Sequence, residues 1–368
     1  MTPQANQRPR TAGTATDTAP VRPGEELDTG ALRRHLAEAA PTTVPAAATG
    51  IEVEQFPSGH SNLTYLVRTP ADGAQYVLRR APLGPIAPRA HDMAREFDVL
   101  RRLAPCYPPV PLPLHLCEDP SVIGSAFYLM ERRHGTVVRD RVPADYQLLP
   151  DIGRRLSITL VDTLVDLHAV DVTTTGLLAM GRPDGFLDRQ VEGWARRWER
   201  ARTADVPAID QLLAWLRTHR PEPLRPAVVH NDFKLDNLML DPADPKRVVA
   251  VLDWEMTTVG DPLVDLGLSL VYWQHPNTAE DQQPAIGAAG DALAQWFTRE
   301  QFLARYARRS GRDLSHVDWY EALGFLKLTV ITQQIYRRWV DGQTADERFA
   351  RMDTRVAHLA DASLSRLT

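Results

Sequence analysis

The sequence predicts an α+β protein in two parts, a β-rich first part and a mainly helical second part. Short runs rich in Val, Tyr and Leu lie between Ile51 and Arg80 and are separated by turn residues, which is typical of an antiparallel meander. From about Asp151 onward, apolar residues recur at helical spacing instead. With 368 residues, of which 43% are hydrophobic, the chain has enough material for one large two-part domain or two average domains.

The N-terminal segment, residues 1–25, is predicted to be a disordered tail. It is rich in Thr, Ala, Pro and Arg and has no apolar period that would hold it to a core. The β-rich part then covers residues 26–131 and opens with a short helix within Leu27–Ala40, where Leu32 and Leu36 are four residues apart. Prolines at positions 41 and 45 end this helix.

Three strands, a helix and a further strand complete the β-rich part. The strands of the meander are expected at Ile51–Phe56, Leu63–Thr69 and Gln75–Arg80. A helix from Ala90 to about Leu103 follows, because its apolar residues share one face, at Met93, Phe97, Leu100 and Leu103. The apolar run Phe127–Glu131 predicts a strand that ends in a polar residue.

The helical part is expected to cover residues 132–368. Two of its helices are predicted from helical spacing, one by Ile152, Leu156, Leu160, Leu164 and Leu167, the other by Leu187, Val191, Trp194 and Trp198. A third lies between Leu323 and Trp339. We interpret His168, Trp194 and Trp198 as core residues, because they lie on apolar helix faces. The neighbouring arginines are interpreted as solvated charges, namely Arg196, Arg197 and Arg200.

Composition excludes several classes of partner. A formal net charge of −5 gives no reason to expect nucleic acid or an anionic membrane. No apolar run approaches the ~20 residues that cross a bilayer. The N-terminus lacks the apolar stretch of a secretory signal, so a cytoplasmic protein is expected. Cys106 and Cys117 have no metal-binding spacing and predict ordinary reduced thiols. No oligomeric state is indicated.

Two motifs in the helical part carry the chemistry. The first is His230-Asn-Asp-Phe-Lys-Leu-Asp-Asn237, and the second is an apolar strand, Val248–Leu252, that ends at Asp253. One carboxylate to orient a hydroxyl, with an amide and a second carboxylate to hold magnesium, is the minimum set for moving a phosphoryl group from ATP. Either motif alone also fits a polar turn with Asx caps, but the ordered pair favours a catalytic site.

The residue patterns of these two motifs resemble those of a known family. HxDxKxxN followed by an apolar strand and Asp is similar to the protein-kinase-like superfamily. The fuller pattern HNDFKLDN…LDWE…GDPLVDLG resembles its small-molecule branch, the aminoglycoside phosphotransferase and choline kinase group, and within it the kinase-like proteins associated with acyl-CoA dehydrogenases. The resemblance runs from about Ile51 to the C-terminus. Asp-Trp-Glu, in place of the Asp-Phe-Gly of protein kinases, favours a small-molecule substrate over a protein.

The resemblance implies a bilobal protein-kinase-like fold with ATP and Mg²⁺ bound between a β-rich lobe and a helical lobe. Asp232 would accept or orient the proton of the attacking hydroxyl, and Lys234 would place a cation near the transferred phosphoryl group. Asn237 and Asp253 would ligate Mg²⁺ through oxygen. His230 is expected to stabilise the loop through hydrogen bonds. Asp261 and Asp265 are expected to be structural: Asp261 orders its loop, and Asp265 braces the catalytic loop or caps a helix.

The nucleotide-binding residues are expected in the β-rich part. The small polar loop Ser58, Gly59, His60, Ser61 and Asn62 would lay backbone N–H groups over phosphate oxygens, although alone it also fits an ordinary hairpin turn. In the protein-kinase-like superfamily the third strand usually supplies a Lys that pairs with a helix Glu, whereas the relatives associated with acyl-CoA dehydrogenases commonly show Arg there. This chain offers Arg79 instead, with Glu96 as its partner, so the phosphate geometry need not match that of Lys. Adenine would lie near Met130 and Glu131.

The hydroxyl acceptor is the least specified part of the prediction. From Val271 to the end the chain has twelve acidic and twelve basic side chains. This segment therefore lacks the excess of acidic side chains that would suit a polycationic aminoglycoside. Arginine clusters at 305–312 and 337–338 suit an anion at least as well. The resemblance implies a hydroxyacyl-CoA or hydroxy acid, with an antibiotic as the alternative. A nucleotide-binding regulator without transferase activity is a third possibility, and a metal-dependent phosphohydrolase ranks last.

Overall fold

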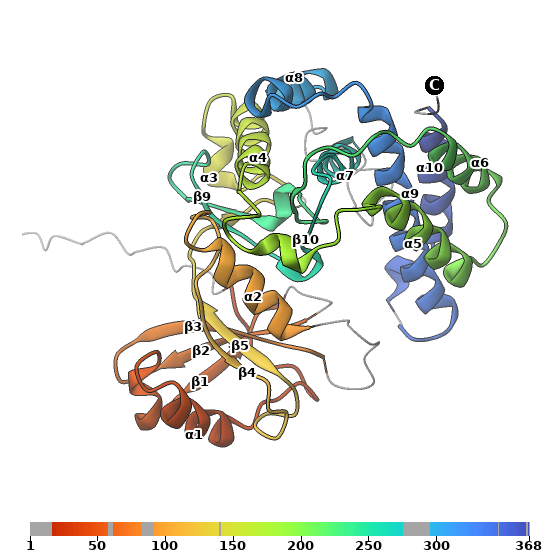
Figure 1. Ribbon diagram of the computed structural model, residues 1–368. Coiled ribbons are helices and arrows are strands. Elements are labelled where there is room, and N and C mark those ends of the chain that lie inside the picture. Colours follow the sequence, from red (N-terminus) through yellow and green to blue (C-terminus); the bar gives the residue numbers. More distant parts are fainter. Residues whose placement is uncertain are drawn as a thin grey trace, which may run out of the picture. The chain divides into compact units, whose positions relative to one another are not determined.

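The computed structural model describes residues 17–57, 62–82, 92–139, 141–274, 295–344, 346–365 and 367 (Figure 1). The chain forms two compact units. The first holds the residues up to Phe97 together with Pro113–Arg132, and the second holds Asp98–Leu112 and Arg133–Thr368. The first unit is built on a sheet and the second is mainly helical, which confirms the predicted α+β class.

The sheet of the first unit has five antiparallel strands in the order β1-β2-β3-β5-β4. Their bounds are Glu52–Gln55 (β1), Leu63–Thr69 (β2), Ala74–Arg80 (β3), Pro113–Cys117 (β4) and Phe127–Glu131 (β5). The predicted meander is therefore β1-β2-β3, and the predicted strand at 127–131 joins it as the neighbour of β3. Turn residues between β-forming runs located β1, β2 and β3, and the apolar run at 127–131 located β5, whereas β4 was not predicted.

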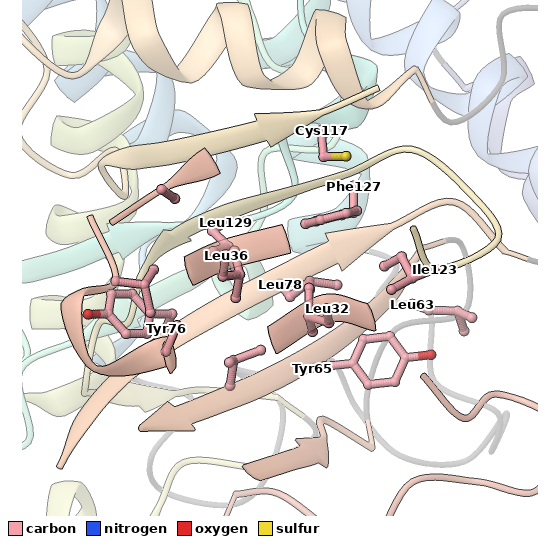
Figure 2. Close-up of a cluster of buried hydrophobic side chains, with 14 residues drawn as sticks. Leu32, Leu36, Leu63, Tyr65, Tyr76, Leu78, Cys117, Ile123, Phe127 and Leu129 are labelled. Atoms are coloured by element: carbon pink, nitrogen blue, oxygen red, sulfur yellow. The ribbon is translucent and has the colours of Figure 1, made fainter. Parts of the chain in front are cut away.

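One face of this sheet is covered by α1 (Thr29–Ala39), as Figure 2 shows. The Asp28 side chain caps the helix by accepting the backbone N–H of Ala31 at 2.8 Å. Leu32 and Leu36, four residues apart, are fully buried and pack with the inward side chains of the sheet, which are Leu63, Tyr65, Val67, Tyr76, Leu78, Phe127 and Leu129. A short 3₁₀ turn, η1 (Pro45–Thr49), follows the helix.

The predicted disordered tail, residues 1–25, extends too far, because its last residues are held by contacts with the sheet. Ala19 pairs with Gln55 of β1 through two backbone hydrogen bonds of 2.8 Å. The backbone N–H of Arg22 donates to the Gln55 side chain, and the Glu25 carbonyl accepts from Tyr65 at 2.6 Å. Composition alone could not reveal these contacts, because they depend on the exposed edge of β1. Residues 1–16 lie outside the described part.

The second unit contains most of the helices. They are α3 (Ala144–Gln147), α4 (Ile152–His168), α5 (Phe186–Ala201), α6 (Pro207–Thr218), α7 (Leu263–Gln274), α8 (Arg299–Ser310), α9 (Val317–Val340) and α10 (Met352–Leu364), with 3₁₀ turns η2 (Leu177–Met180) and η6 (Glu347–Phe349). The segments predicted at 152–167, 187–198 and 323–339 fall within α4, α5 and α9. Helix α2 (Met93–Leu103) begins in the first unit and ends in the second.

Helices α7 and α9 pack backbone to backbone. A Cβ atom at Gly267 of α7 would lie 2.1 Å from the Tyr320 carbonyl oxygen, and one at Gly324 of α9 would lie 2.9 Å from the Gly267 carbonyl oxygen. Glycine is therefore required at both positions. The close approach fixes α7 against the long central helix, and α7 in turn contacts the loop that follows β7.

Two small sheets frame that loop. In one, β7 (Ala227–Val229) pairs with β10 (Thr258–Gly260), and in the other β6 (Thr136–Val137), β8 (Leu238–Leu240) and β9 (Val248–Val251) pair in that order. Single 3₁₀ turns, η3 (Leu235–Asn237) and η4 (Trp254–Met256), connect them. Within the described ranges, every helix is too short or too polar to span a bilayer.

Candidate active site

The loop after β7 is held by the α7 residue Asp265. Its carboxylate accepts the backbone N–H of His230 at 2.6 Å and that of Asn231 at 2.7 Å. Asn231 adopts φ = +69°, a left-handed conformation that few residues other than Gly, Asn and Asp accept. The predicted bracing of the catalytic loop by Asp265 is thus confirmed. Asp261 orders its own turn, as predicted, by accepting the backbone N–H of Leu263 at 3.0 Å.

Behind Asp265 lies a chain of buried polar side chains. The Tyr306 hydroxyl contacts His168 Nδ1 at 2.8 Å, and His168 Nε2 lies 3.4 Å from Asp265 Oδ2. Burial lowers the pKa of His168, so the ring is neutral; Tyr306 then donates to Nδ1, and Nε2–H donates to Asp265. Burial opposes ionisation of Asp265, but these hydrogen bonds hold its pKa below the ordinary value. The interpretation of His168 as a satisfied core histidine is confirmed.

His230 is also a structural residue of the loop, as predicted. Its Nε2 lies 2.9 Å from the Leu252 carbonyl oxygen, at the end of β9. Its ring contacts the rings of Phe233 and Trp254, and the residue is fully buried. The contact ties the loop after β7 to the segment that carries Asp253.

The Asp232 carboxylate is oriented by three side chains. Tyr272 of α7 donates its hydroxyl to Oδ1 at 2.8 Å, and Asn237 donates Nδ2–H to Oδ2 at 2.9 Å. The Lys234 ammonium lies 3.3 Å from Oδ2. Each oxygen therefore has a partner that fixes its direction, while Asp232 itself is only partly buried. Such an arrangement is suited to accepting a hydrogen bond from a substrate hydroxyl in a fixed geometry.

Tyr272 was not predicted from the sequence. A signal was present, because Tyr272 follows Asp265 by seven residues, which is nearly two helical turns and places both on one face of α7. Ser269 lies on the same face and donates its hydroxyl to the Phe233 carbonyl oxygen at 2.6 Å. One face of α7 thus supplies three contacts to the loop. Burial and the Asp232 charge raise the pKa of Tyr272 well above its ordinary value, so it remains a donor.

Lys234 is held between acidic side chains. Besides Asp232, its ammonium lies 3.5 Å from Asp236 Oδ2 and 4.9 Å from the centre of the Tyr272 ring. Burial opposes its charge, but the carboxylates of Asp232, Asp236 and Asp253 raise the pKa of Lys234 above its ordinary value. Lys234 is therefore a fixed cation beside Asp232. Burial and the Asp232 charge raise the pKa of Asp236.

Asn237 and Asp253 lie at the same end of the pair of strands β8 and β9. Leu238 of β8 is paired with Val251 of β9, and beyond this pair the Leu252 backbone N–H donates to the Asn237 carbonyl oxygen at 2.8 Å. Asp253 follows directly and adopts φ = +67°, which turns the chain out of the strand. Because the Asn237 amide nitrogen is engaged by Asp232, its oxygen is the atom left to face a cation. This places two oxygen donors at one end of the hairpin.

The first unit contains the predicted pair of Arg79 and Glu96. Side chains alternate along β3, so Leu78 and Arg80 face α1 while Arg79 faces the opposite side with Tyr128, its partner in β5. The ring of Tyr128 contacts Phe97 of α2. Arg79 Nη1 lies 3.4 Å from Glu96 Oε1, and Glu96 is 2% exposed, so the predicted ion pair is present.

Strand alternation also separates Arg79 from its neighbour. Arg80 is 1% exposed and donates to the carbonyl oxygens of Ile123 and Glu25, which makes it a structural residue of the α1 face. Met130 lies opposite Val77 at the end of β5, and Glu131 follows it. Of the predicted phosphate loop, Asn62 is described and buried, whereas Ser58, Gly59, His60 and Ser61 lie outside the described residues.

Comparisons with known proteins identify the family. Residues 52–320 match the Phosphotransferase enzyme family, a span that contains both motifs and the Arg79–Glu96 pair. The chain belongs to this family. Chicken acyl-CoA dehydrogenase family member 11 is 33% identical over 94% of the chain, and mouse acyl-CoA dehydrogenase family member 10 is 34% identical over 89%. The chain spans 44% and 30% of the length of these two relatives, respectively.

Solved structures agree with the family. A Ralstonia eutropha protein, provisionally described as an aminoglycoside phosphotransferase, shares 31% identity and a TM-score of 0.76 over 93% of this chain and 98% of its own. An ethanolamine kinase from Plasmodium vivax has a TM-score of 0.59 at 11% identity, over 91% of this chain and 89% of its own, which is a likeness of fold. The protein-kinase-like fold and the resemblance to aminoglycoside phosphotransferases are confirmed.

Proposed function

We propose that the protein is an ATP- and Mg²⁺-dependent kinase that phosphorylates a hydroxyl group of a small molecule. The observation that carries this proposal is the set of contacts around Asp232, a partly exposed carboxylate held by Tyr272, Asn237 and Lys234. Phosphoryl transfer proceeds through a loose transition state and needs positioning and charge stabilisation more than a strong base. A carboxylate of fixed direction beside a fixed cation meets that need.

In this proposal Asp232 accepts a hydrogen bond from the acceptor hydroxyl and takes its proton as the acceptor oxygen bonds to the γ-phosphorus of ATP, whose bond to the oxygen that leaves with ADP breaks. Lys234 stabilises the negative charge on the phosphoryl oxygens, and its carboxylate neighbours keep it protonated for that role. Asn237 would contribute twice, since its amide nitrogen orients Asp232 and its oxygen would be a ligand for the cation.

The oxygen donors at the end of the β8–β9 hairpin fit magnesium. Mg²⁺ is commonly held by one or two protein oxygen ligands together with substrate phosphates, rather than by a cage of protein ligands. In the described part of the chain, no three His, Cys, Asp or Glu side chains gather to hold a metal by themselves, which agrees with such a shared site. Asn237 and Asp253 would hold the ion. When bound, it would neutralise charge on the nucleotide phosphates.

We further propose that Arg79, oriented by Glu96, contacts the nucleotide phosphates from the first unit. The ion pair is nearly buried, and Arg79 is 12% exposed in its side chain. An Arg in this role presents a planar fork to phosphate oxygens, whereas Lys presents a point charge. Ser58–Asn62, Met130 and Glu131 complete the proposed nucleotide site.

For the acceptor we propose a hydroxyacyl-CoA or a related hydroxy acid. Support comes from the relatives at 33% and 34% identity, which are named as acyl-CoA dehydrogenase family members and are much longer than this chain. The 31% identity to the Ralstonia protein keeps an aminoglycoside or another antibiotic as the second candidate. The two candidates differ in charge, which makes them separable by assay.

A mass-spectrometric screen for a phosphate mass gain tests the proposal. The acceptors are hydroxyacyl-CoAs, free hydroxy acids, aminoglycosides, macrolides, choline and simple sugars, each with Mg²⁺ and either ATP or GTP. We expect a phosphorylated hydroxyacyl-CoA or hydroxy acid. The Asp232→Asn variant is the control, and its kcat should fall by at least ~10²-fold with nucleotide affinity retained, the scale for loss of a general base. Tight Mg·ATP binding with no product from any acceptor would instead favour a nucleotide-binding regulator.

A further inference from the structure

Lys327 is a buried lysine that the proposed chemistry does not use. It lies in α9, amid apolar neighbours, and is 1% exposed. Its ammonium donates to Asn231 Oδ1 at 2.9 Å, so a residue of the central helix touches the loop residue directly before Asp232. A lysine is rarely buried this fully without a partner that requires it.

Asn231 is the residue through which the loop is held. Its backbone N–H donates to Asp265, its side-chain nitrogen donates to the Met256 carbonyl oxygen at 2.8 Å, and its side-chain oxygen accepts from Lys327. These bonds keep Asn231 in its left-handed conformation. Asp232 is the next residue, so the backbone conformation of Asn231 sets the direction in which the Asp232 side chain leaves the backbone.

The charges around the Lys327 ammonium come from three places. Burial, the largest cause, and Arg197 of α5 lower the pKa of Lys327, whereas Asp265 of α7 and Asp232 of the loop raise it, and together they leave it at about 8. The Trp194 ring of α5 lies 5.9 Å from the ammonium. Helices α6 and α10 also pack on α9, but within the described residues neither places a charge that acts on Lys327. The charged form thus depends on the carboxylates of the site.

We propose that Lys327 is a positioning residue for phosphoryl transfer, which holds Asn231 and thereby aligns Asp232 with the acceptor hydroxyl. This inference rests on the proposed function. A role in stability alone does not explain the choice of residue, because an apolar side chain would fill the same space without the cost of burying a charge. The buried ammonium is explained by a need to hold Asn231, and through it Asp232, in a fixed geometry.

Three variants of the full chain test the proposal. Lys327→Met removes the charge at similar volume, Lys327→Arg keeps it, and Lys246→Met is the control at an exposed lysine. The assay is ADP release from Mg·ATP, with hydroxybutyryl-CoA or with water as the acceptor. We expect Lys327→Met to lower kcat by ~10²-fold, the scale of a small misplacement of a catalytic group, while the KM for ATP and the Tm change little. Lys327→Arg should recover much of the kcat.

The pH profile separates positioning from packing. In the wild type, kcat should fall as pH rises through about 8, because Lys327 loses its proton and its bond to Asn231 weakens. In Lys327→Arg this decline should disappear, since a guanidinium stays charged at that pH. Wild-type kcat and pH profile in both Lys327 variants would overturn the inference and leave the proposed function intact. If the wild type releases no ADP with either acceptor, both the inference about Lys327 and the proposed function are wrong.

Discussion

At the scale of single residues, the Tyr272 hydroxyl orients the carboxylate of Asp232, for which we propose the catalytic role. The Tyr272→Phe variant keeps the ring and removes only the donor to Asp232 Oδ1. A hydrogen bond to a charged group contributes about 1.5–3 kcal/mol, so we expect kcat to fall by at least ~10-fold with the KM for ATP unchanged. Steady-state kinetics checks this, with Tyr336→Phe as the control, because Tyr336 lies in α9 and its ring stacks on Trp339. If the two variants have equal kcat and KM values, the Tyr272 hydroxyl has no part in the function of Asp232.

We propose that Asp253 holds the magnesium ion and takes no part in proton transfer. We expect Asp253→Ala to weaken Mg·ATP binding, because only the Asn237 oxygen would remain at the end of the hairpin. Isothermal titration of ATP at several Mg²⁺ concentrations measures the effect. Asp244→Ala is a suitable control, since Asp244 lies exposed in the β8–β9 turn. If the Mg²⁺ dependence is the same in both variants, the metal site lies elsewhere.

At the scale of elements, α7 and α9 both carry side chains that contact the loop after β7, and they pack closely at Gly267 and Gly324. Gly267→Ala would place a Cβ 2.1 Å from a carbonyl oxygen, and neither backbone can yield without separating the helices. We expect a loss of about 1–3 kcal/mol or more in the free energy of unfolding, the cost of overpacking a core. Urea denaturation followed by circular dichroism measures this change.

Gly193→Ala of α5 is the matched control, because nothing lies within 4 Å of its added Cβ. There the substitution should stabilise the protein by roughly 0.5–1 kcal/mol, since Ala favours a helix over Gly. The two substitutions are chemically identical, so a destabilisation by Gly193→Ala of the same size would mean that the α7–α9 contact is not the cause.

At the scale of the whole molecule, stability should fall in mild acid. Burial keeps the folded-state pKa of His168 below the ordinary value of 6.5, so the unfolded chain binds more protons as pH falls below 6.5. The contribution of neutral His168 is present above that pH and is lost as pH falls through the folded-state pKa. Asp265, whose folded-state pKa is also lowered, adds a second loss below about pH 4.

Urea unfolding at pH 7 and pH 5 tests the histidine part of this expectation. The free energy of unfolding of the wild type should be smaller at pH 5. In His168→Gln that difference should shrink, because the group that gains a proton is gone. His134→Gln, at an exposed histidine, should behave as the wild type does. A difference that is equally large in all three proteins would assign the acid sensitivity to other groups.

The fold class could be predicted, and the main residues of the candidate site could be proposed, because both depend on local sequence patterns. Turn residues between β-forming runs located β1, β2 and β3, and helical spacing located α4, α5 and α9. The motif at 230–237 singled out Asp232, Lys234 and Asn237 by their order and spacing, and the end of β9 singled out Asp253. The ordering of residues 17–25 was missed, because it depends on a strand edge more than 30 residues away.

By itself, the sequence determined the elements, the family resemblance and the residues that the motifs contain, because each of these depends on neighbours along the chain. Only the tertiary structure decided which side chains meet the catalytic loop. Tyr272 reaches Asp232 across 40 residues of sequence and Lys327 reaches Asn231 across 96. Both contacts come from helices that pack closely at two glycines, and no local pattern specifies which faces of distant helices will be brought together.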